Sequence, residues 1–482
     1  MPINSFLYPG AKFTPPYKVT NSCRFDDGSS DHLSQSLSSS FKSTWTWSGW
    51  VKRANLTSSG LFGNQRTDNN INSRFKLFFN SSDQIQWEIK DSTGNDDSAL
   101  KTNRLFRDVS AWYHIVFIYD TTNGTAGDRL QLYVNGTRET SFATEDQAGS
   151  NFGSLWSSDL KHYVGVANGN SGLDHYFDGY MAEVVFIDGS AVAHTEFGEF
   201  DSDSPNIWKP KDVSGLTFGS DGYYLDFKNS GSLGADVSGN SNNFTVNNLT
   251  SADQTTDTCT NNYCTMLSHT LGSYATISEG NLKLVGNSSS DSGNSLSSFA
   301  FSSGKWYWEM KVSEDTASVN YPQFVVFKTT DVKYGRQNNN GSDGNPATSP
   351  THVIGMTMSD GYFSGTSFTS GTTGASSNGD IIQFFFDMDN GAFYAGRNGT
   401  LFNSANPASG ASKTGALVTW TPDGREYAIT STNFLNSVIE FNFGNPTFSI
   451  SSGNSDGNGY GNFEYDPQGY YALNTKNLAE FG

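Results

Sequence analysis

Residues 112–136 contain two β-forming runs rich in apolar residues with a polar break between them, and this pattern predicts a β-hairpin. The run HIVFIYD at 114–120 is apolar almost throughout, which is typical of a central strand covered on both faces. In RLQLYVNG at 129–136 apolar and polar residues alternate with the period of a half-buried strand. The Thr-, Asn- and Gly-rich residues 122–128 supply the turn between them, since glycine takes positive φ without strain.

A second hairpin with the same order of features is predicted at 379–402, GDIIQFFFDMDNGAFYAGRNGTLF. In both hairpins the first strand ends in an aspartate, Asp120 or Asp387, and the turn contains Asn-Gly. Both second strands end in Asn-Gly-Thr. Two such hairpins so far apart in the chain predict two β domains in tandem.

The other periodic segments also favour an all-β fold. The run TWTWSGWVKR at 44–53 places Trp45 and Trp47 on one face of a strand, although Trp50 breaks strict alternation. No window shows sustained helical periodicity, and the best candidate for a short helical turn is 191–200. We therefore predict two tandem antiparallel β-sandwich (jelly-roll) domains.

Composition along the chain predicts where these domains begin and end. Residues 1–20 contain four prolines, which fix φ and withdraw backbone donors, so this segment is predicted to be an extended N-terminal arm. The first domain is assigned to 21–250 and the second to 273–482. Residues 251–272 have no apolar period and few bulky side chains, and are predicted to be a linker.

The arm carries more apolar surface than an ordinary tail. Its large side chains are Phe6, Leu7, Tyr8 and Phe13. Burial of such groups is favourable, so the arm either lies over its own domain or docks onto a neighbour. We expect the second arrangement, in which these four residues anchor the protein to another copy or to another protein.

Composition excludes several classes of partner. Of the 482 residues, 14% are aromatic and only 16% are charged, and the formal net charge is −19. The aromatic residues are enough to build two cores. An acidic surface repels nucleic acid and anionic membranes, so we expect neither nucleic-acid binding nor membrane insertion. The N-terminal sequence lacks the features of a secretory signal, so we expect any export to occur by lysis or particle assembly.

Several motifs in the same order connect the chain to known families. With the hairpin at 112–136, TWTWSGWVKR (44–53) and YFDGYMAEVVFIDGSAV (176–192) resemble laminin-G-like, concanavalin-like jelly-roll domains. GKWYWEMKV (304–312) and FNFG (441–444), with the second hairpin, resemble a SPRY domain, which is another bent β-sandwich. The pairing of the two, with the opening FDDGSSDHL and the closing GYYALNTKNL, is similar to structural proteins of bacteriophages, especially marine ones.

This resemblance implies a non-catalytic structural or adhesion component on the surface of a phage particle: a capsid decoration, head-fibre or tail-fibre protein. It implies contacts with other virion proteins through the arm, a homo-oligomer, and contacts with host-surface glycans. Two other classes stay open, a jelly-roll glycan depolymerase and a secreted lectin-like adhesion protein. The lack of a convincing acid pair argues against the first, and the lack of a signal against the second.

Hydrolysis of glycans by such a fold requires two carboxylates roughly 5 Å apart. Asp387 and Asp389 have a suitable spacing, but they lie where a strand enters an Asn-Gly turn, and we interpret them as turn formers. Glu183 is a lone carboxylate that we expect at a rim or sheet edge. We therefore predict no catalytic residues.

No cofactor is predicted, and a metal ion is not indicated. Asp26, Asp27 or Asp178 could supply oxygens to a loop-bound calcium ion, although their spacing does not require one. An EF-hand loop starting at Asp387 fails, because its twelfth residue is asparagine.

Cys259 and Cys264 are either half of a metal site or a small disulfide, or two unrelated thiols. We favour unrelated thiols, because no second Cys or His pair accompanies them. The pattern G-x-S-x-G at 453–457 lies in a loop without the strand and helix of a nucleophile elbow, and is interpreted as chance. His114 is interpreted as a strand histidine that faces its neighbours.

Glycans are bound by planar polar groups and aromatic faces on loops, and two loops have this composition. The candidate recognition residues are Tyr334, Arg336, Asn338 and Asn339 in the loop 333–350, and Tyr460 in the loop 453–461. The competing interpretation is that both loops only maintain a neutral, soluble exterior.

Overall fold

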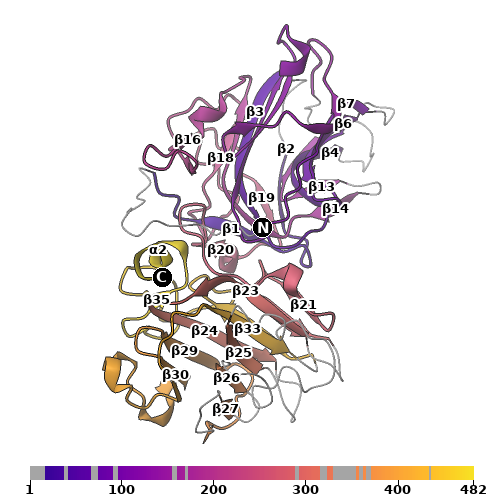
Figure 1. Cartoon of the computed structure of the whole chain (residues 1–482). Coiled ribbons are helices and arrows are strands. Elements are labelled where there is room, and N and C mark those ends of the chain that lie inside the picture. The colour runs from indigo at the N-terminus through magenta and orange to yellow at the C-terminus, as the bar shows by residue number, and fades with distance from the viewer. Residues whose placement is uncertain are drawn as a thin grey trace. The chain divides into compact units, whose positions relative to one another are not determined.

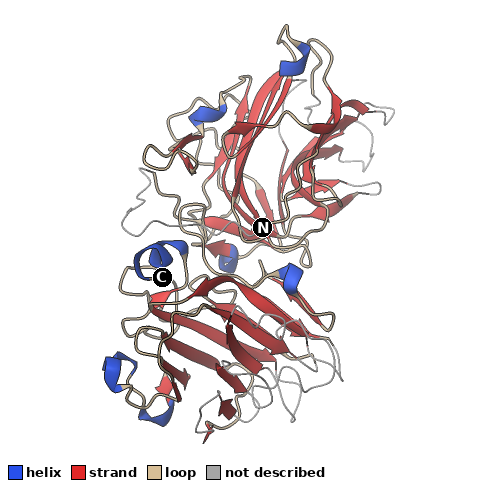
Figure 2. Cartoon of the chain, in the orientation of Figure 1, coloured by secondary structure: helices blue, strands red, loops and turns tan. Residues whose placement is uncertain are grey.

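The computed structural model describes residues 17–36, 42–66, 74–90, 96–154, 160–168, 172–287, 293–314, 323–328, 354–357, 362–364, 371–433 and 436–482. The chain divides into two compact units, the first ending at Thr260 and the second beginning at Asn261. Both consist of antiparallel sheets (Figures 1 and 2), and the one α-helix among the described residues is α2 (Thr475–Phe481). The prediction of an all-β fold is confirmed.

Two eight-stranded sheets face each other in the first unit (Figure 1). One has the order β10-β9-β8-β3-β15-β1-β20, with β18 also paired to β15. Its strands are β10 (Thr137–Arg138), β9 (Leu130–Val134), β8 (Tyr113–Asp120), β3 (Thr44–Arg53), β15 (Gly179–Asp188), β1 (Ser22–Phe25), β20 (Gln254–Thr255) and β18 (Tyr223–Leu225).

The opposite sheet has the order β11-β7-β6-β5-β4-β12-β2-β19. Its strands are β11 (Phe142–Asp146), β7 (Asp96–Thr102), β6 (Ile85–Lys90), β5 (Arg74–Phe79), β4 (Ser59–Arg66), β12 (Leu160–Val164), β2 (His32–Ser36) and β19 (Thr245–Asn247). Two small strand pairs accompany the sandwich: β13 (Val166–Asn168) with β14 (Leu173–Tyr176), and β16 (Gly198–Phe200) with β17 (Trp208–Pro210).

Aromatic rings fill the space between the two sheets. Trp45 on β3 stacks on Tyr119 at 5.1 Å between ring centroids and meets Trp87 of the opposite sheet at 5.5 Å. Trp87 in turn stacks on Phe117 at 4.6 Å. Every second residue of these strands points inward, so the alternation in the sequence becomes one shared core.

Trp50 follows the alternation of β3 after all, because it points to the outer face of its sheet. There it packs with Val19, Ala182 and Trp208 and is 4% exposed. A further cluster, which includes Val116, covers the same face, so the central strands are buried on both sides. This explains why HIVFIYD is apolar almost throughout.

A nine-stranded and a six-stranded sheet form the second unit. The first has the order β21-β22-β34-β24-β29-β30-β31, with β32 paired to β30 and β35 to β24; the second has the order β23-β33-β25-β26-β27-β28. The strands are β21 (Ala275–Ser278), β22 (Lys283–Gly286), β34 (Val438–Asn442), β24 (Lys305–Glu314), β29 (Ile381–Asp387), β30 (Ala392–Arg397), β31 (Thr400–Leu401), β32 (Val418–Thr419), β35 (Tyr471–Ala472), β23 (Gly293–Phe301), β33 (Tyr427–Asn433), β25 (Gln323–Lys328), β26 (Ile354–Thr357), β27 (Tyr362–Ser364) and β28 (Gly371–Thr372).

The segment 251–272, which the sequence predicts as a linker, is packed along much of its length. β20 pairs with β1, and the Asp257 carboxylate accepts a hydrogen bond from buried Lys52 Nζ at 2.8 Å. Cys264 is buried in the second unit, where its N–H donates to the Leu473 carbonyl at 2.9 Å. This segment packs through hydrogen bonds of short polar side chains. Because few of its residues are apolar, its sequence shows no periodic pattern of apolar residues, which is why it resembles a linker.

The start of the first unit lies against its end. The Val19 carbonyl accepts hydrogen bonds from the hydroxyls of Thr258 (3.1 Å) and Thr260 (2.9 Å). Tyr17 is half-buried in the Trp50 cluster. The last four residues of the predicted arm, 17–20, therefore rest on the first unit, whereas the predicted anchors Phe6, Leu7, Tyr8 and Phe13 lie outside the described residues.

Candidate functional site

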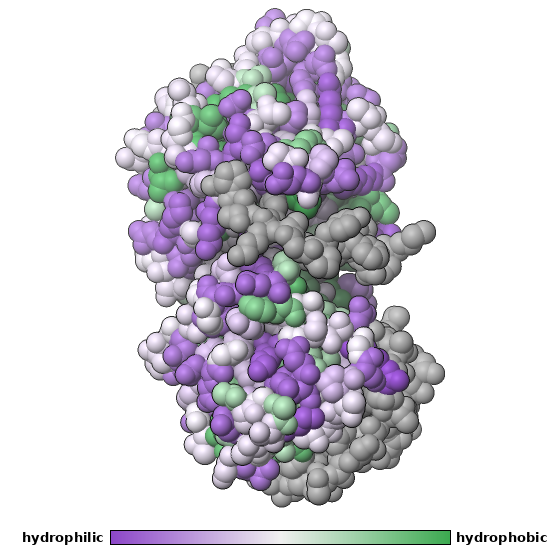
Figure 3. Space-filling view, turned by 60° about the vertical axis from the view of Figure 1, so that its left-hand side comes forward, coloured by the Kyte–Doolittle hydropathy of each residue, from purple (hydrophilic) through white to green (hydrophobic). Residues whose placement is uncertain are grey.

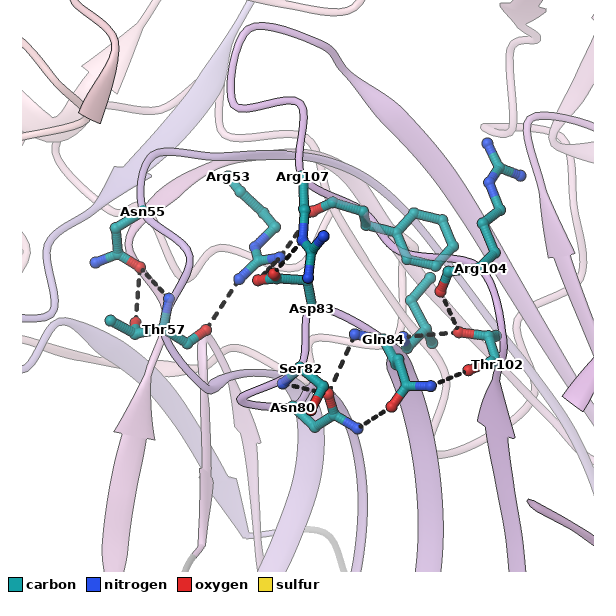
Figure 4. Close-up of polar contacts among 12 residues, drawn as sticks. Arg53, Asn55, Thr57, Asn80, Ser82, Asp83, Gln84, Thr102, Arg104 and Arg107 are labelled. Atoms are coloured by element: carbon teal, nitrogen blue, oxygen red, sulfur yellow. Dashed lines mark hydrogen bonds and ion pairs between the residues drawn. The ribbon is translucent and has the colours of Figure 1, made fainter. Parts of the chain in front are cut away.

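Three loops of the first unit meet at one end of the sandwich and form a polar rim, which we define as residues 54–58, 80–84 and 103–107 (Figure 4). The middle loop is held in a tight turn by Asn80, whose side-chain oxygen accepts from the N–H of Ser82 at 2.9 Å and of Gln84 at 3.1 Å. Asn and Asp favour such turns because their side chains substitute for backbone acceptors.

A buried ion pair joins the three loops of the rim. Arg53 and Arg107 both donate to the Asp83 carboxylate, at 3.2 Å and 2.8 Å. The Arg53 guanidinium also donates to the carbonyls of Phe106 (2.8 Å) and Thr57 (3.0 Å), and therefore contacts all three loops (Figure 4). Burial lowers the pKa of Arg53, and the Asp83 carboxylate opposes this shift.

The outer part of the rim presents planar cationic groups to solvent. The Arg107 side chain is 59% exposed, and Asp83 contacts it through Nε, so the opposite edge of the guanidinium is accessible. Arg104 is 44% exposed and is held by Glu139 at 2.8 Å, and Leu105 between the two arginines is 42% exposed. A guanidinium oriented in this way can donate two parallel hydrogen bonds to a ligand.

Within the rim, Asn55 brings together two of the three predicted calcium ligands. Its amide donates to Asp27 at 2.9 Å and to Asp178 at 2.8 Å, whereas the Asp26 carboxylate accepts from the Ser29 N–H at 3.2 Å. Burial raises the pKa of Asp27. Over the ranges that the structure describes, no group of three or more His, Cys, Asp or Glu side chains is placed to hold a metal ion.

Among the three carboxylates considered for hydrolysis, only Glu183 lies in surroundings that differ from the expectation. Asp387 is buried and accepts hydrogen bonds from both the N–H and the side chain of Asn390, at 2.9 Å each. Asp389 accepts from the Gly304 N–H at 2.7 Å. Glu183 is not a rim or edge residue: it is 4% exposed on β15, which corrects the expectation. The physical reason is that the outer face of its sheet is itself covered.

His114 lies in a stack of rings and cannot act as a base toward serine. The indole Nε1 of Trp208 donates to its Nδ1 at 2.9 Å, so the proton of the neutral ring is on Nε2. That nitrogen therefore donates to Ser48 Oγ, 2.9 Å away, which is the reverse of a catalytic Ser-His pair. Burial lowers the pKa of His114 to about 3, so the ring is neutral at ordinary pH.

Of the predicted recognition residues, Tyr334, Arg336, Asn338 and Asn339 lie outside the described residues, and Tyr460 lies inside them. The Tyr460 N–H donates to Asp456 at 2.9 Å, and its ring is partly buried against an aromatic cluster. The loop that holds it also contains the G-x-S-x-G pattern, which is followed by turns and not directly by a helix.

Part of the first unit matches a family model. Residues 27–195 match the laminin G-like model of the Concanavalin A-like lectin/glucanases superfamily. The first unit carries a concanavalin A-like domain. The laminin-G-like expectation for this part of the chain is confirmed. Because the family includes both lectins and glucanases, the match establishes the fold, and the choice between binding and hydrolysis depends on the site.

Searches of solved structures find distant likenesses. The SPRY domain of human HERC1 has 13% identity and a TM-score of 0.27, covering 36% of this chain and 96% of its own. A heptameric SAP-like pentraxin from Limulus polyphemus has 12% identity and a TM-score of 0.29, covering 37% and 81%. The CBM40 of a Ruminococcus gnavus IT-sialidase, bound to sialyllactose, has 14% identity and a TM-score of 0.27, covering 37% and 96%. Likenesses at this level carry no argument about function, and the SPRY resemblance stays a prediction.

No curated protein matches the chain in sequence. No helix among the described residues is long and apolar enough to cross a membrane. The structure contains no disulfide at Cys23, Cys259 or Cys264, and the interpretation of Cys259 and Cys264 stays a prediction.

The rim of the concanavalin A-like domain is the feature that sequence reasoning misses. Arg53, Asp83 and Arg107 are far apart in the chain, and each reads as an ordinary polar residue next to a strand. The sequence does contain one signal for this site. In the run RLFR at 104–107 two arginines flank two large apolar residues, which is unusual in a chain of net charge −19. On the face shown in Figure 3 the hydrophobic residues form small, separate patches among hydrophilic ones.

Proposed function

We propose that the protein is a non-catalytic adhesion protein whose concanavalin A-like domain binds glycans at the rim. The observation that carries this proposal is the Arg53–Asp83–Arg107 network. It fixes three loops from beneath and leaves an oriented guanidinium at the surface. Pre-organisation of this kind reduces the entropy that binding costs.

Planar groups of the rim suit the chemistry of sugars. Guanidinium and amide groups donate paired hydrogen bonds to neighbouring hydroxyls or to a carboxylate, and the exposed side chain of Leu105 offers an apolar contact for a sugar ring. Glycans with a carboxylate should bind better than neutral ones, because a charged acceptor strengthens each hydrogen bond from arginine.

Binding is favoured over hydrolysis because the candidate acids are engaged elsewhere. Asp387 holds the turn of its hairpin, Asp389 accepts a hydrogen bond from the Gly304 N–H, and Glu183 is buried under tyrosines. The depolymerase alternative requires an accessible pair of carboxylates. The described residues near the rim provide aspartates that are already bound to Asn55 or to arginine.

Replacement of Arg107 by alanine should weaken glycan binding by about 10- to 100-fold, since one or two charge-assisted hydrogen bonds are lost. Folding should be preserved, because Asp83 keeps its buried partner Arg53. The ligand is chosen by screening the full chain on an array of acidic and neutral glycans, and its affinity is then measured by calorimetry.

Arg138→Ala is the matched control, because this arginine is 35% exposed and pairs with Asp128 at 2.7 Å, away from the three loops that define the rim. It should leave the affinity unchanged. Equal losses in both variants would show that net charge, not the rim, determines binding. If the protein binds no glycan on the array, the proposal is wrong.

The location on a phage particle is part of the same proposal and rests on the sequence resemblance alone. In this proposal the protein is a surface component, a homo-oligomer held to other virion proteins by the arm. Mass spectrometry of purified particles from the organism that encodes the protein should detect it in stoichiometric amounts. Its absence from the particles, with release into the medium, would favour the secreted lectin-like alternative.

A further inference from the structure

Glu183 occupies a strained position in the middle of a buried sheet. Opposite β3, the register of β15 shifts between Ala182 and Val185, so β15 contains a bulge there. The φ of Glu183 is +50°, in the left-handed region that residues with a side chain seldom adopt. Strain of this kind is retained only where the surroundings determine it.

The two carboxylate oxygens of Glu183 have unequal surroundings. Oε2 accepts hydrogen bonds from Tyr224 at 2.6 Å and from Tyr17 at 3.1 Å, and the two tyrosine hydroxyls are 3.2 Å apart. Oε1 is buried and has no hydrogen-bond partner among the described residues. Tyr224 belongs to β18, whereas Tyr17 lies before the first strand of the unit.

This geometry suits a protonated carboxyl better than a carboxylate. An ionised carboxylate spreads its charge over both oxygens and requires donors at each of them. Here one oxygen has donors and the other has none, so ionisation leaves charge on a buried atom without compensation. Departure of Tyr17, which is half-buried, would admit water to the carboxylate.

We propose that Glu183, Tyr17 and Tyr224 form a proton-dependent clasp that holds the N-terminal segment on the first unit. The clasp is closed while Glu183 is protonated and loosens when Glu183 ionises. Tyr17 is the part that leaves, since Tyr224 is fixed in a strand and Val19 is held by Thr258 and Thr260. The state of the clasp therefore decides whether Tyr17 and Lys18 lie on the first unit, while Val19 is held there in both states.

The other titratable groups around the clasp do not replace the proton on Glu183. Burial raises the pKa of Glu183 to about 7, and the bonds from Tyr224 and Tyr17 and the charge of Lys228 only partly oppose this, while Asp226 adds to it. Burial also raises the pKa of Tyr17, to which Asp212 contributes, and that of Tyr224, so both remain donors. The Cys259 thiol near Glu183 likewise has a raised pKa through burial, and stays neutral.

The sign of the pH dependence follows from this. Burial raises the pKa of Glu183 while the clasp is closed, and water admitted by the departure of Tyr17 would bring that pKa back toward its ordinary value, so the closed state is favoured fully below the ordinary pKa of the side chain. This stabilisation is lost as the pH rises through about 7. Between about pH 5.5 and pH 8.5, opening should increase by at least about tenfold.

Cleavage by trypsin after Lys18, an exposed residue between Tyr17 and Val19, reports on opening. The full chain is compared with Glu183→Gln, which keeps an acceptor for the tyrosines and cannot ionise. The ratio of the two initial rates at each pH cancels the pH dependence of the protease. We expect a ratio that rises about tenfold between about pH 6 and pH 8.5. Tyr17→Phe, which removes the latch hydroxyl, should be cleaved rapidly at both pH values.

A ratio that does not change with pH would overturn the proposal, as would slow cleavage of Tyr17→Phe. If Glu183→Gln does not fold, the carboxyl carbon of Glu183 can be followed by NMR in the unaltered protein. A titration midpoint near the ordinary value of an exposed glutamate, about 4.3, would then contradict the clasp. The clasp and the proposed glycan binding are independent, so a result that contradicts one of these proposals does not contradict the other.

Discussion

Asp257→Asn should lower the free energy of unfolding of the first unit by about 3–5 kcal/mol, because it leaves a buried ammonium group without its counter-charge. The side chains of Lys52 and Asp257 are 1% and 0% exposed, and their charged atoms are 2.8 Å apart. Asp257 also accepts a hydrogen bond from the Trp112 indole at 3.1 Å. The measurement is guanidinium unfolding of the full chain.

Arg138→Gln serves as the control, because its ion pair with Asp128 is exposed to solvent and should contribute less than about 1 kcal/mol. The double variant Lys52→Met with Asp257→Leu should recover part of the loss, since a buried pair replaced by apolar groups is often neutral for stability. A loss of less than about 1 kcal/mol in Asp257→Asn would mean that water reaches Lys52.

The second large effect is expected in the second unit, where Glu309 is fully buried on β24 and accepts four hydrogen bonds. The donors are Tyr307 Oη (2.8 Å) and Tyr465 N (2.7 Å) to Oε1, and Asn442 Nδ2 (3.0 Å) and Glu464 N (3.0 Å) to Oε2. Glu309→Leu removes every acceptor at once and leaves buried donors unsatisfied. The second unit should lose roughly 4 kcal/mol or more of stability.

Hydrogen exchange of peptides from β24 and β3 assigns each unfolding transition to its unit. Glu480→Leu is the control, because Glu480 is exposed and accepts one hydrogen bond from Asn458 at 3.2 Å; its effect should stay within about 0.5 kcal/mol. Glu309→Leu should not move the transition of the first unit. An equal loss in both units would show that they do not unfold separately.

Apolar runs separated by Asn-Gly turns were sufficient to predict the hairpins. The hairpin at 112–136 is β8 and β9, and the hairpin at 379–402 is β29 and β30, with Asp387 at the end of β29, where its side chain binds the turn. The alternation in β3 holds through Trp50, where the sequence suggests a break. The alternation of apolar and polar residues does not reveal whether both faces of a strand are covered. A tryptophan on the outer face, such as Trp50, therefore looks like a break in the alternation.

Polar packing is what the sequence could not predict. Asp257 and Glu309 are buried charges, and Arg53 and Asp83 bind one another across three loops, yet all four have the appearance of surface residues. Glu183 was expected at an edge for the same reason. Hydrophobic patterns report apolar burial, whereas these groups are buried because their partners arrive from distant parts of the chain.

The contact between the start and the end of the first unit has a mechanical consequence. β1 and β20 are antiparallel, with Ser22 opposite Thr255, and the Val19 carbonyl is bound by Thr258 and Thr260 just outside the pair. Tension applied along the chain would therefore load these hydrogen bonds one after another, as in opening a zipper, and not all at once in shear. Under pulling, the edge strand β20 is the part that peels away first, while the aromatic core between the sheets carries no load.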